Sequence, residues 1–211
     1  MLDLSRKLTD ELIIGDETYQ LDLSFNNILK LFEMWRDMEI PETVKPHFAL
    51  RLLVGKDFEG SRLAGLPVEE ALLIFMKIFE EHIQLQEAKD VSVEYDLAGN
   101  VMKSSQSDSS GQAPSYNIEL DGDFIFASFL QAYNIDLFEV QGQLHWKKFN
   151  ALLAGLPEGT KFVEVIKIRK YKPQKGESQE YISEMRRLQK EYALPGQSMV
   201  ENEEELNEFE N

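Results

Sequence analysis

The chain's one cluster of histidine and carboxylate side chains consists of Glu80, Glu81 and His82, followed by Glu87. These residue types carry out general acid–base catalysis and bind metal ions when they converge on one point. On a helix, however, successive side chains point about 100° apart, so three consecutive residues do not face one ion. We therefore expect a solvated helix face here, without a catalytic or metal-binding role.

A second histidine of interest is His145, which precedes Trp146 and lies among apolar residues. A histidine beside an aromatic ring could act in a cleft, but its only ionisable neighbour at helical spacing is Lys148. We interpret His145 as a hydrogen-bonded residue of the core or its boundary. Trp146 is either a core anchor or an interface hot spot, since tryptophan is enriched in both. A place in the core is the preferred interpretation.

Much other chemistry is excluded by residues that the chain lacks. It has no cysteine, so disulfides, thiolate metal sites and a cysteine nucleophile are ruled out. Only three histidines are present, too few for a histidine-rich metal site. Signatures of phosphate-binding loops, dinucleotide folds, zinc proteases and serine hydrolases are absent. The sequence thus predicts no catalytic residue, no metal and no cofactor.

The chain is strongly acidic, with 38 Asp and Glu against 22 Lys and Arg and a net charge of −16. Nucleic-acid binding depends on cationic side chains that release counterions, so nucleic acid is not an expected partner. Basic residues do gather between Lys161 and Lys190, including Arg186 and Arg187. We interpret this stretch as a basic segment that meets an acidic partner, or the chain's own glutamate-rich C-terminal residues.

Hydropathy gives no sign of a membrane or a secretion route. No apolar run reaches the roughly 18 residues of a membrane span. The N-terminal residues have no apolar stretch of the signal-peptide kind. We expect a soluble protein of the cytoplasm.

The N-terminal half begins with a predicted β-hairpin. Runs 12–14 and 19–23 flank Gly15-Asp16, and glycine accepts the positive φ of a tight turn. Apolar and polar residues alternate over 19–23, as in a strand with one buried face.

Apolar residues spaced by three and four predict helices next. Ser24 is the expected N-cap of the first, Pro46 an interruption, Gly55 the end of the second and Pro67 the first residue of the third. The predicted ranges are 25–38, 48–54 and 67–88.

Residues 91–115 differ in composition from the rest of the chain. Ser, Asp, Gln and Gly dominate 103–114, which lacks the apolar side chains that would offset the entropy of ordering it. We divide the chain into an N-terminal unit of hairpin and helices, a flexible linker, a C-terminal helical unit and an acidic disordered tail. Their bounds are 1–90, 91–115, 116–194 and 195–211. A long surface loop within a single domain is an alternative of equal weight for the linker.

The C-terminal unit is predicted to be helical. Asp121 or Asp123 caps the first helix and Asn134 stops it. For the third predicted helix, 161–171, the β-branched residues leave a strand as the alternative. The fourth, 179–192, carries many charges and is expected to be exposed or to bind a partner. The predicted helices are 124–133, 143–154, 161–171 and 179–192. The fold class is therefore mainly α with a small N-terminal β-hairpin, as two bundle-like helical halves joined by a flexible linker.

Five segments between Tyr116 and Arg169 form a recognisable pattern: Asp123–Tyr133, Ile135–Leu137, Leu144–Trp146, Lys148–Pro157 and Ile168–Arg169. In these segments the chain resembles a bacteriophage family, the gp-fifteen proteins of siphophages and prophages of Gram-positive bacteria. The resemblance extends over most of the chain, up to about residue 172. The resemblance implies a second tryptophan after Trp146, where this chain has Lys147.

The resemblance implies a role in phage tail assembly, because genes of this family lie between those of the major tail protein and the tape-measure protein. Proteins from that position often act as tail assembly chaperones, which coat the tape measure and recruit tail-tube subunits. The expected partners are therefore the tape-measure and major tail proteins, in the host bacterial cytoplasm during assembly. Self-association is left open. The candidate partner-binding residues are Trp146, Phe149, Tyr133, Arg186 and Arg187.

Two alternatives remain open at this point. A structural minor tail component would stay in the finished virion, whereas an assembly chaperone would leave. An enzyme of unrecognised type is the second alternative, although no catalytic signature supports it.

Overall fold

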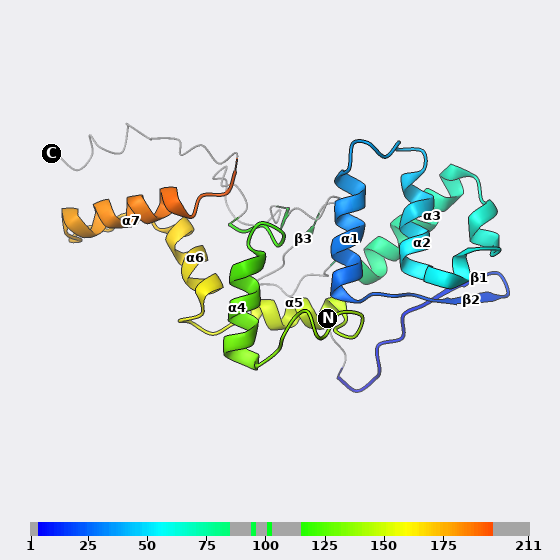
Figure 1. Ribbon diagram of the computed structural model, residues 1–211, viewed down its shortest axis with the longest axis horizontal. Helices are drawn as coiled ribbons and strands as arrows, with labels where there is room; N and C mark the ends of the chain where they lie inside the picture. Colours follow the sequence, from blue (N-terminus) through cyan, green and yellow to red (C-terminus); the bar gives the residue numbers. More distant parts are fainter. Residues whose placement is uncertain (1–3, 85–93, 96–100, 103–114, 196–211) are drawn as a thin grey trace.

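The computed structural model describes residues 4–84, 94–95, 101–102 and 115–195. Within these residues the chain is mainly helical with an antiparallel hairpin near its N-terminus, which confirms the predicted fold class. Figure 1 shows an elongated arrangement of these elements. The hairpin and first three α-helices lie at one end, the next two in the middle and the last two at the other end.

The hairpin consists of β1 (Glu11–Ile14) and β2 (Glu17–Gln20), paired antiparallel as predicted. Between them, Gly15 has a φ of 63°, a conformation that glycine adopts at little cost. β2 is shorter than the predicted strand. The predicted alternation nevertheless continues beyond it, and the buried residues are Tyr19, Leu21 and Leu23.

Three helices follow: α1 (Phe25–Arg36), α2 (Lys45–Val54) and α3 (Val68–Ile78). Ser24 takes the predicted N-cap position, although its hydroxyl makes no capping hydrogen bond. The prediction that Pro46 interrupts the chain is wrong. Pro46 lies in the first turn of α2, where its missing N–H costs nothing, so the helix starts earlier than predicted. Gly55, with a φ of 67°, ends α2 as predicted, and Pro67 caps α3 rather than starting it.

Beyond α3 the chain makes a π-helical turn over Phe79–Ile83. Residues 85–88 of the predicted helix lie outside the described residues. Two short strands, β3 (Glu94–Tyr95) and β4 (Val101–Met102), pair antiparallel within the predicted linker. Apart from Ser115, the other residues predicted as flexible linker lie outside the described part of the chain, as does nearly all of the predicted acidic tail.

The C-terminal half contains the four helices that the sequence predicts: α4 (Gly122–Tyr133), α5 (Trp146–Ala154), α6 (Lys161–Lys170) and α7 (Gln179–Glu191). Asn134 ends α4 in the left-handed conformation, with a φ of 53°. α5 starts three residues later than predicted, because the preceding backbone is extended and pairs with the chain before α1. The alternative of a strand for α6 is not realised.

The centre of the core is a stack of aromatic rings between α1, α4 and α5. The ring centroid of Phe149 lies 5.0 Å from that of Phe25 and 5.3 Å from that of Phe129. Trp146 stacks on Phe149 at 5.8 Å and meets the edge of Phe32 at 5.7 Å. Phe129, Trp146 and Phe149 are each at most 1% exposed, and the burial of Trp146 confirms the preferred interpretation of that residue.

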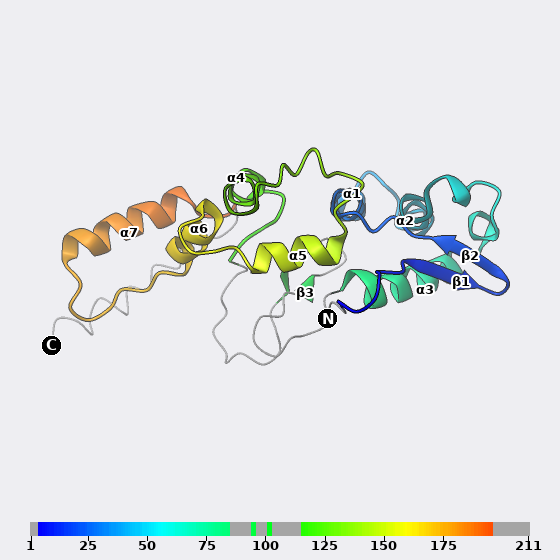
Figure 2. The ribbon, with the colours of Figure 1, turned by 90° about the horizontal axis from the view of Figure 1, so that it is seen from below.

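This core includes residues from both sides of the predicted linker. In Figure 2, α5 lies lengthwise between the α1–α3 end and the α4–α6 end of the molecule. Two main-chain hydrogen bonds hold it there: Phe25 N–H donates to Leu144 O at 2.9 Å, and Trp146 N–H donates to Leu23 O at 2.7 Å. Residues 4–84 and 115–165 therefore pack on one another directly, whatever the conformation of the segment that connects them.

Truncating Phe149 to alanine removes a ring from the middle of this stack. We expect Phe149→Ala to lower the free energy of unfolding by about 3–5 kcal/mol, the cost of a large cavity in a core. Urea denaturation followed by circular dichroism measures this loss. Phe138→Ala is the matched control because Phe138 is 71% exposed, and its loss should be much smaller. Equal losses for the two variants would contradict the proposed core.

Candidate functional site

A large open groove lies between α1 and α2. It has a volume of about 850 Å³. Its apolar lining consists of Met34 and Ile40 on one side and Phe48 and Leu52 on the other. Phe48 is 41% exposed, an unusual position for a phenylalanine that has a core within reach. The groove therefore offers apolar surface to a partner.

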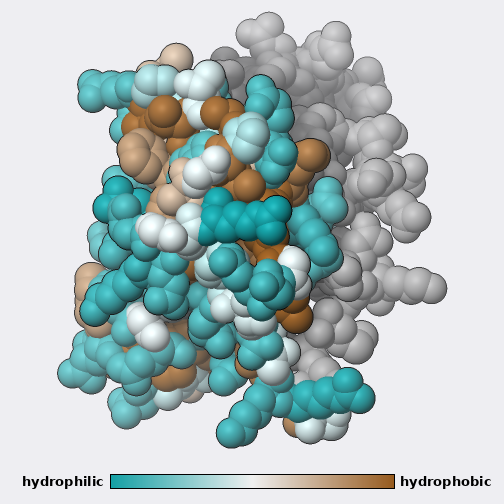
Figure 3. Space-filling model, turned by 90° about the vertical axis from the view of Figure 1, so that its right-hand side faces the viewer, coloured by the Kyte–Doolittle hydropathy of each residue, from teal (hydrophilic) through white to brown (hydrophobic). Residues whose placement is uncertain are grey.

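Charged residues of both signs surround this groove. Lys30, Glu33 and Asp37 come from α1 and the turn after it. Arg51 on α2 forms an ion pair with Glu59, with 3.0 Å between Nη2 and Oε1. Figure 3 views the molecule from the end that carries α2, α3 and the hairpin, where hydrophobic patches emerge among hydrophilic side chains.

A second polar feature lies where α5 begins. His145 is the N-cap of α5, and its Nδ1 accepts a hydrogen bond from the Lys147 N–H at 2.9 Å. Because Nδ1 accepts, the proton lies on Nε2, which donates to the Asp10 carboxylate 3.1 Å away. This confirms the interpretation of His145 as a hydrogen-bonded boundary residue. The partner Asp10 is 135 positions away in the sequence, which is why helical spacing did not reveal it.

The same end of α5 contacts the π-helical turn after α3. Trp146 Nε1–H donates to the Ile83 carbonyl at 2.9 Å, and the Lys147 ammonium donates to the Glu81 carbonyl at 3.3 Å. The Lys147 side chain therefore bonds to the turn that follows α3. These bonds fix α5 against the N-terminal half.

His82 lies beside this junction. Burial lowers the pKa of His82 below its ordinary value of 6.5, and the positive charge of Lys147 lowers it further. The carboxylates of Asp10 and Glu81 act in the opposite direction without reversing the shift. Glu80 and Glu81 are exposed, with Glu81 Oε2 3.9 Å from His82 Nε2, and Glu87 lies outside the described residues.

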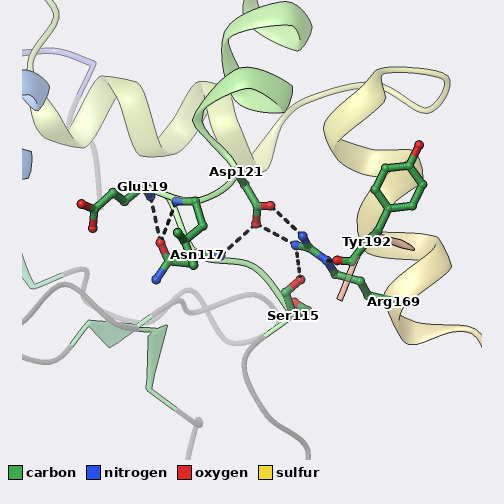
Figure 4. Close-up of polar contacts among 7 residues, drawn as sticks. Ser115, Asn117, Glu119, Asp121, Arg169 and Tyr192 are labelled. Atoms are coloured by element: carbon green, nitrogen blue, oxygen red, sulfur yellow. Dashed lines mark hydrogen bonds and ion pairs between the residues drawn. The ribbon is translucent and has the colours of Figure 1, made fainter. Parts of the chain in front are cut away.

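A third feature is the buried ion pair between Asp121 and Arg169 (Figure 4). Both guanidinium Nη atoms lie 2.7 Å from a carboxylate oxygen, and the side chains are 1% and 7% exposed. Arg169 also donates through Nε to the Tyr192 carbonyl at 2.6 Å and through Nη1 to the Ser115 carbonyl at 3.3 Å. Asp121 accepts one more hydrogen bond, from the Asn117 N–H at 2.9 Å.

This ion pair connects the start of α4, the end of α6 and the end of α7. Asp121 takes the N-cap position of α4 that the sequence offered it, but its carboxylate makes no capping bond because Arg169 occupies it. A buried pair of this kind is stable only when its remaining hydrogen-bonding groups are satisfied, as several are here. The arrangement positions helices and offers no catalytic chemistry.

The predicted partner-binding residues are spread over the molecule. Trp146 and Phe149 are buried in the aromatic stack, so contact with a partner would require the core to open. Tyr133 is partly buried, and its hydroxyl donates to the Leu152 carbonyl at 2.9 Å. Burial raises the pKa of Tyr133. Arg186 and Arg187 are exposed on α7, and their contact with a partner stays a prediction.

The sequence did not reveal the α1–α2 groove, nor that Asp121 and Arg169 form an ion pair. Phe48 was predicted only as the first residue of a short helix. Its helical phase relative to Leu50 and Leu53, which are buried, is the signal that would have indicated an outward direction. The pair had no local signal, since its members are 48 positions apart.

Within the described part of the chain, no three His, Asp or Glu side chains are arranged to hold a metal ion. None of the described helices combines the length and the apolar composition needed to cross a bilayer. The described residues thus form a mainly helical structure with an open apolar groove between α1 and α2.

The chain belongs to the family described as "Bacteriophage Gp15 protein", whose family model matches residues 8–194. No curated protein and no solved structure matches it. Membership of this family points to a phage structural or assembly protein and, by the same argument, to a non-enzymatic one.

Loss of the buried guanidinium should destabilise the protein strongly. We expect Arg169→Met to lower the free energy of unfolding by about 3–5 kcal/mol, because it leaves the Asp121 carboxylate buried without its partner. Adding Asp121→Asn should restore part of that loss. Arg187→Met is the control, since Arg187 is 63% exposed and pairs at the surface. Urea denaturation of the three variants measures these changes. If Arg187→Met lowered the free energy of unfolding as much as Arg169→Met, the argument would be refuted.

The shifted pKa of His82 makes stability depend on pH. The unfolded chain, with the ordinary pKa of 6.5, takes up the proton before the folded chain does as the pH falls. The contribution of His82 to stability is therefore complete above pH 6.5 and is lost as the pH falls toward the lowered pKa. We expect His82→Gln to be less acid-sensitive than the parent chain in urea midpoints measured from pH 7.5 to 5. Parallel pH profiles would contradict this.

Proposed function

We propose that this protein is a tail assembly chaperone of its phage, which binds the tape-measure protein, recruits tail-tube subunits and performs no chemistry. The observation that supports this most directly is the open apolar groove between α1 and α2. A chaperone for a long amphipathic helix needs such a groove, because the apolar face of the helix must be covered until the tail assembles. Family membership supplies the phage context.

The size and rim of the groove fit a helical segment. The lining residues of α1 and its C-cap extend from Lys30 to Asp37, which is about two turns or 12 Å of helix. Two anchoring side chains at i and i+4, or at i and i+3, would fit over this length. The rim carries both signs of charge, so it would fix the orientation of a bound helix rather than select an anion or a cation.

The overall charge also suits a holder of aggregation-prone chains. A net charge of −16 keeps a complex soluble through repulsion between copies. This role places the protein in the host bacterial cytoplasm during assembly.

Coexpression with the tape-measure protein of the same phage tests the proposal. The tape measure should be soluble with this protein and largely insoluble without it. Phe48→Asp should abolish this effect by placing a charge in the groove. Leu73→Asp is the matched control, because Leu73 is an apolar residue of α3 that is 71% exposed and outside the groove. If the solubility of the tape measure were the same with this protein, with Phe48→Asp and without either, the chaperone proposal would be refuted.

Mass spectrometry of purified virions separates the chaperone from a structural tail component. If the protein is a chaperone, peptides from its residues 8–194 should be absent from the particles. Its presence in stoichiometric amount would favour a structural role in the finished tail.

A further inference from the structure

The flank of α6 and α7 carries basic side chains without acidic partners. We define the basic flank as Lys170, Lys172, Lys175, Arg186 and Lys190, all of them exposed. The other cations of this region are engaged: Lys167 with Glu158 and Glu164, and Arg187 with Glu184. Among the described residues, no ion pair involves a member of the basic flank.

Contacts between the two helices bring the basic flank together. Gln189 on α7 donates to the Tyr171 carbonyl at 2.9 Å, and Tyr171 meets Tyr181 edge to face at 5.9 Å between ring centroids. Lys170 and Lys172 flank Tyr171 in the chain, while Arg186 and Lys190 lie one helical turn apart beside Gln189. Positive charges of two elements therefore meet along one edge of α7.

α7 is also incompletely covered. Figure 1 shows it at the far end of the molecule, beside α6. None of its residues is buried, although it carries apolar residues at spacings of three and four. These residues are Tyr181, Met185 and Leu188. The helix thus presents a half-covered apolar stripe next to unpaired positive charges.

The segment that follows α7 has the complementary chemistry. Residues 196–211, here called the acidic segment, contain six glutamates and no lysine or arginine. They also contain apolar residues, among them Leu206 and Phe209. The point where this segment starts is fixed, since Arg169 binds the Tyr192 carbonyl and Leu194 is buried.

We propose that the acidic segment binds the basic flank and the apolar stripe of α7 in its own chain. α7 has 13 residues and is about 20 Å long. The 16 residues of the acidic segment reach up to about 50 Å when extended, more than enough to lie back along the helix. Tethering raises their effective concentration at the helix to about the millimolar range.

Occupation by the acidic segment has a consequence for selectivity. An uncovered basic flank would attract polyanions such as RNA through counterion release. The acidic segment competes with these polyanions for the basic flank. Because it is covalently attached, its effective concentration there does not fall when the protein is diluted. The acidic segment is therefore a built-in screen that keeps nucleic acid off α6 and α7.

Zero-length carbodiimide cross-linking of the full chain tests the contact directly, because it joins a carboxylate to an ammonium only when they touch. Mass spectrometry should find glutamates of the acidic segment linked to lysines of the basic flank. In a mixture of unlabelled and ¹⁵N-labelled protein, these links should join residues of one chain. Links only between chains, or links to lysines elsewhere, would overturn the proposal.

Retention on immobilised heparin tests the screening role. A variant with all six glutamates of the acidic segment changed to glutamine should elute at clearly higher salt than the parent chain. The control changes six exposed glutamates elsewhere and so removes the same charge; it should elute close to the parent. Equal elution of the two variants would show an effect of net charge alone and overturn the proposal. The control positions are Glu11, Glu39, Glu69, Glu70, Glu80 and Glu139.

Discussion

The packing of α5 into the aromatic stack is the interaction on which the rest of the structure depends. Trp146 and Phe149 lie one helical turn apart, so both rings enter the core from the same face of α5. Phe149 contacts Phe25 of the first half and Phe129 of the second half at once. Few other described elements contact both halves, so the packing of this short helix determines their relative position.

Buried polar groups then make this packing specific. The Asp121–Arg169 pair connects three helix ends, and the His145–Asp10 contact connects the start of α5 to the segment before the hairpin. An apolar core alone tolerates small shifts of its elements, whereas a bidentate ion pair tolerates very little. These groups therefore hold the elements in register.

The segments by which the family is identified are largely core segments. Phe129, Trp146, Phe149 and Leu153 lie in or between the matching segments, and all are buried. Their pattern thus reports how the chain packs and says little about what it binds. The α1–α2 groove and the basic flank lie elsewhere and depend on exposed side chains such as Phe48 and Lys172.

The sequence by itself determined the local structure. Periodicity and capping residues located the α-helices of the described residues and the hairpin, because the hydrogen bonds within such a segment depend on neighbouring residues. The errors lie mainly at helix ends, such as the start of α2. Burial of Trp146 was also correctly preferred, since its surroundings are apolar. Only the tertiary structure decided that Asp10 meets His145, that Asp121 meets Arg169, and that Met34 and Phe48 line one open groove. The members of these pairs lie between 14 and 135 positions apart, so no local pattern encodes their arrangement, which exists only once the aromatic stack has brought the helices together.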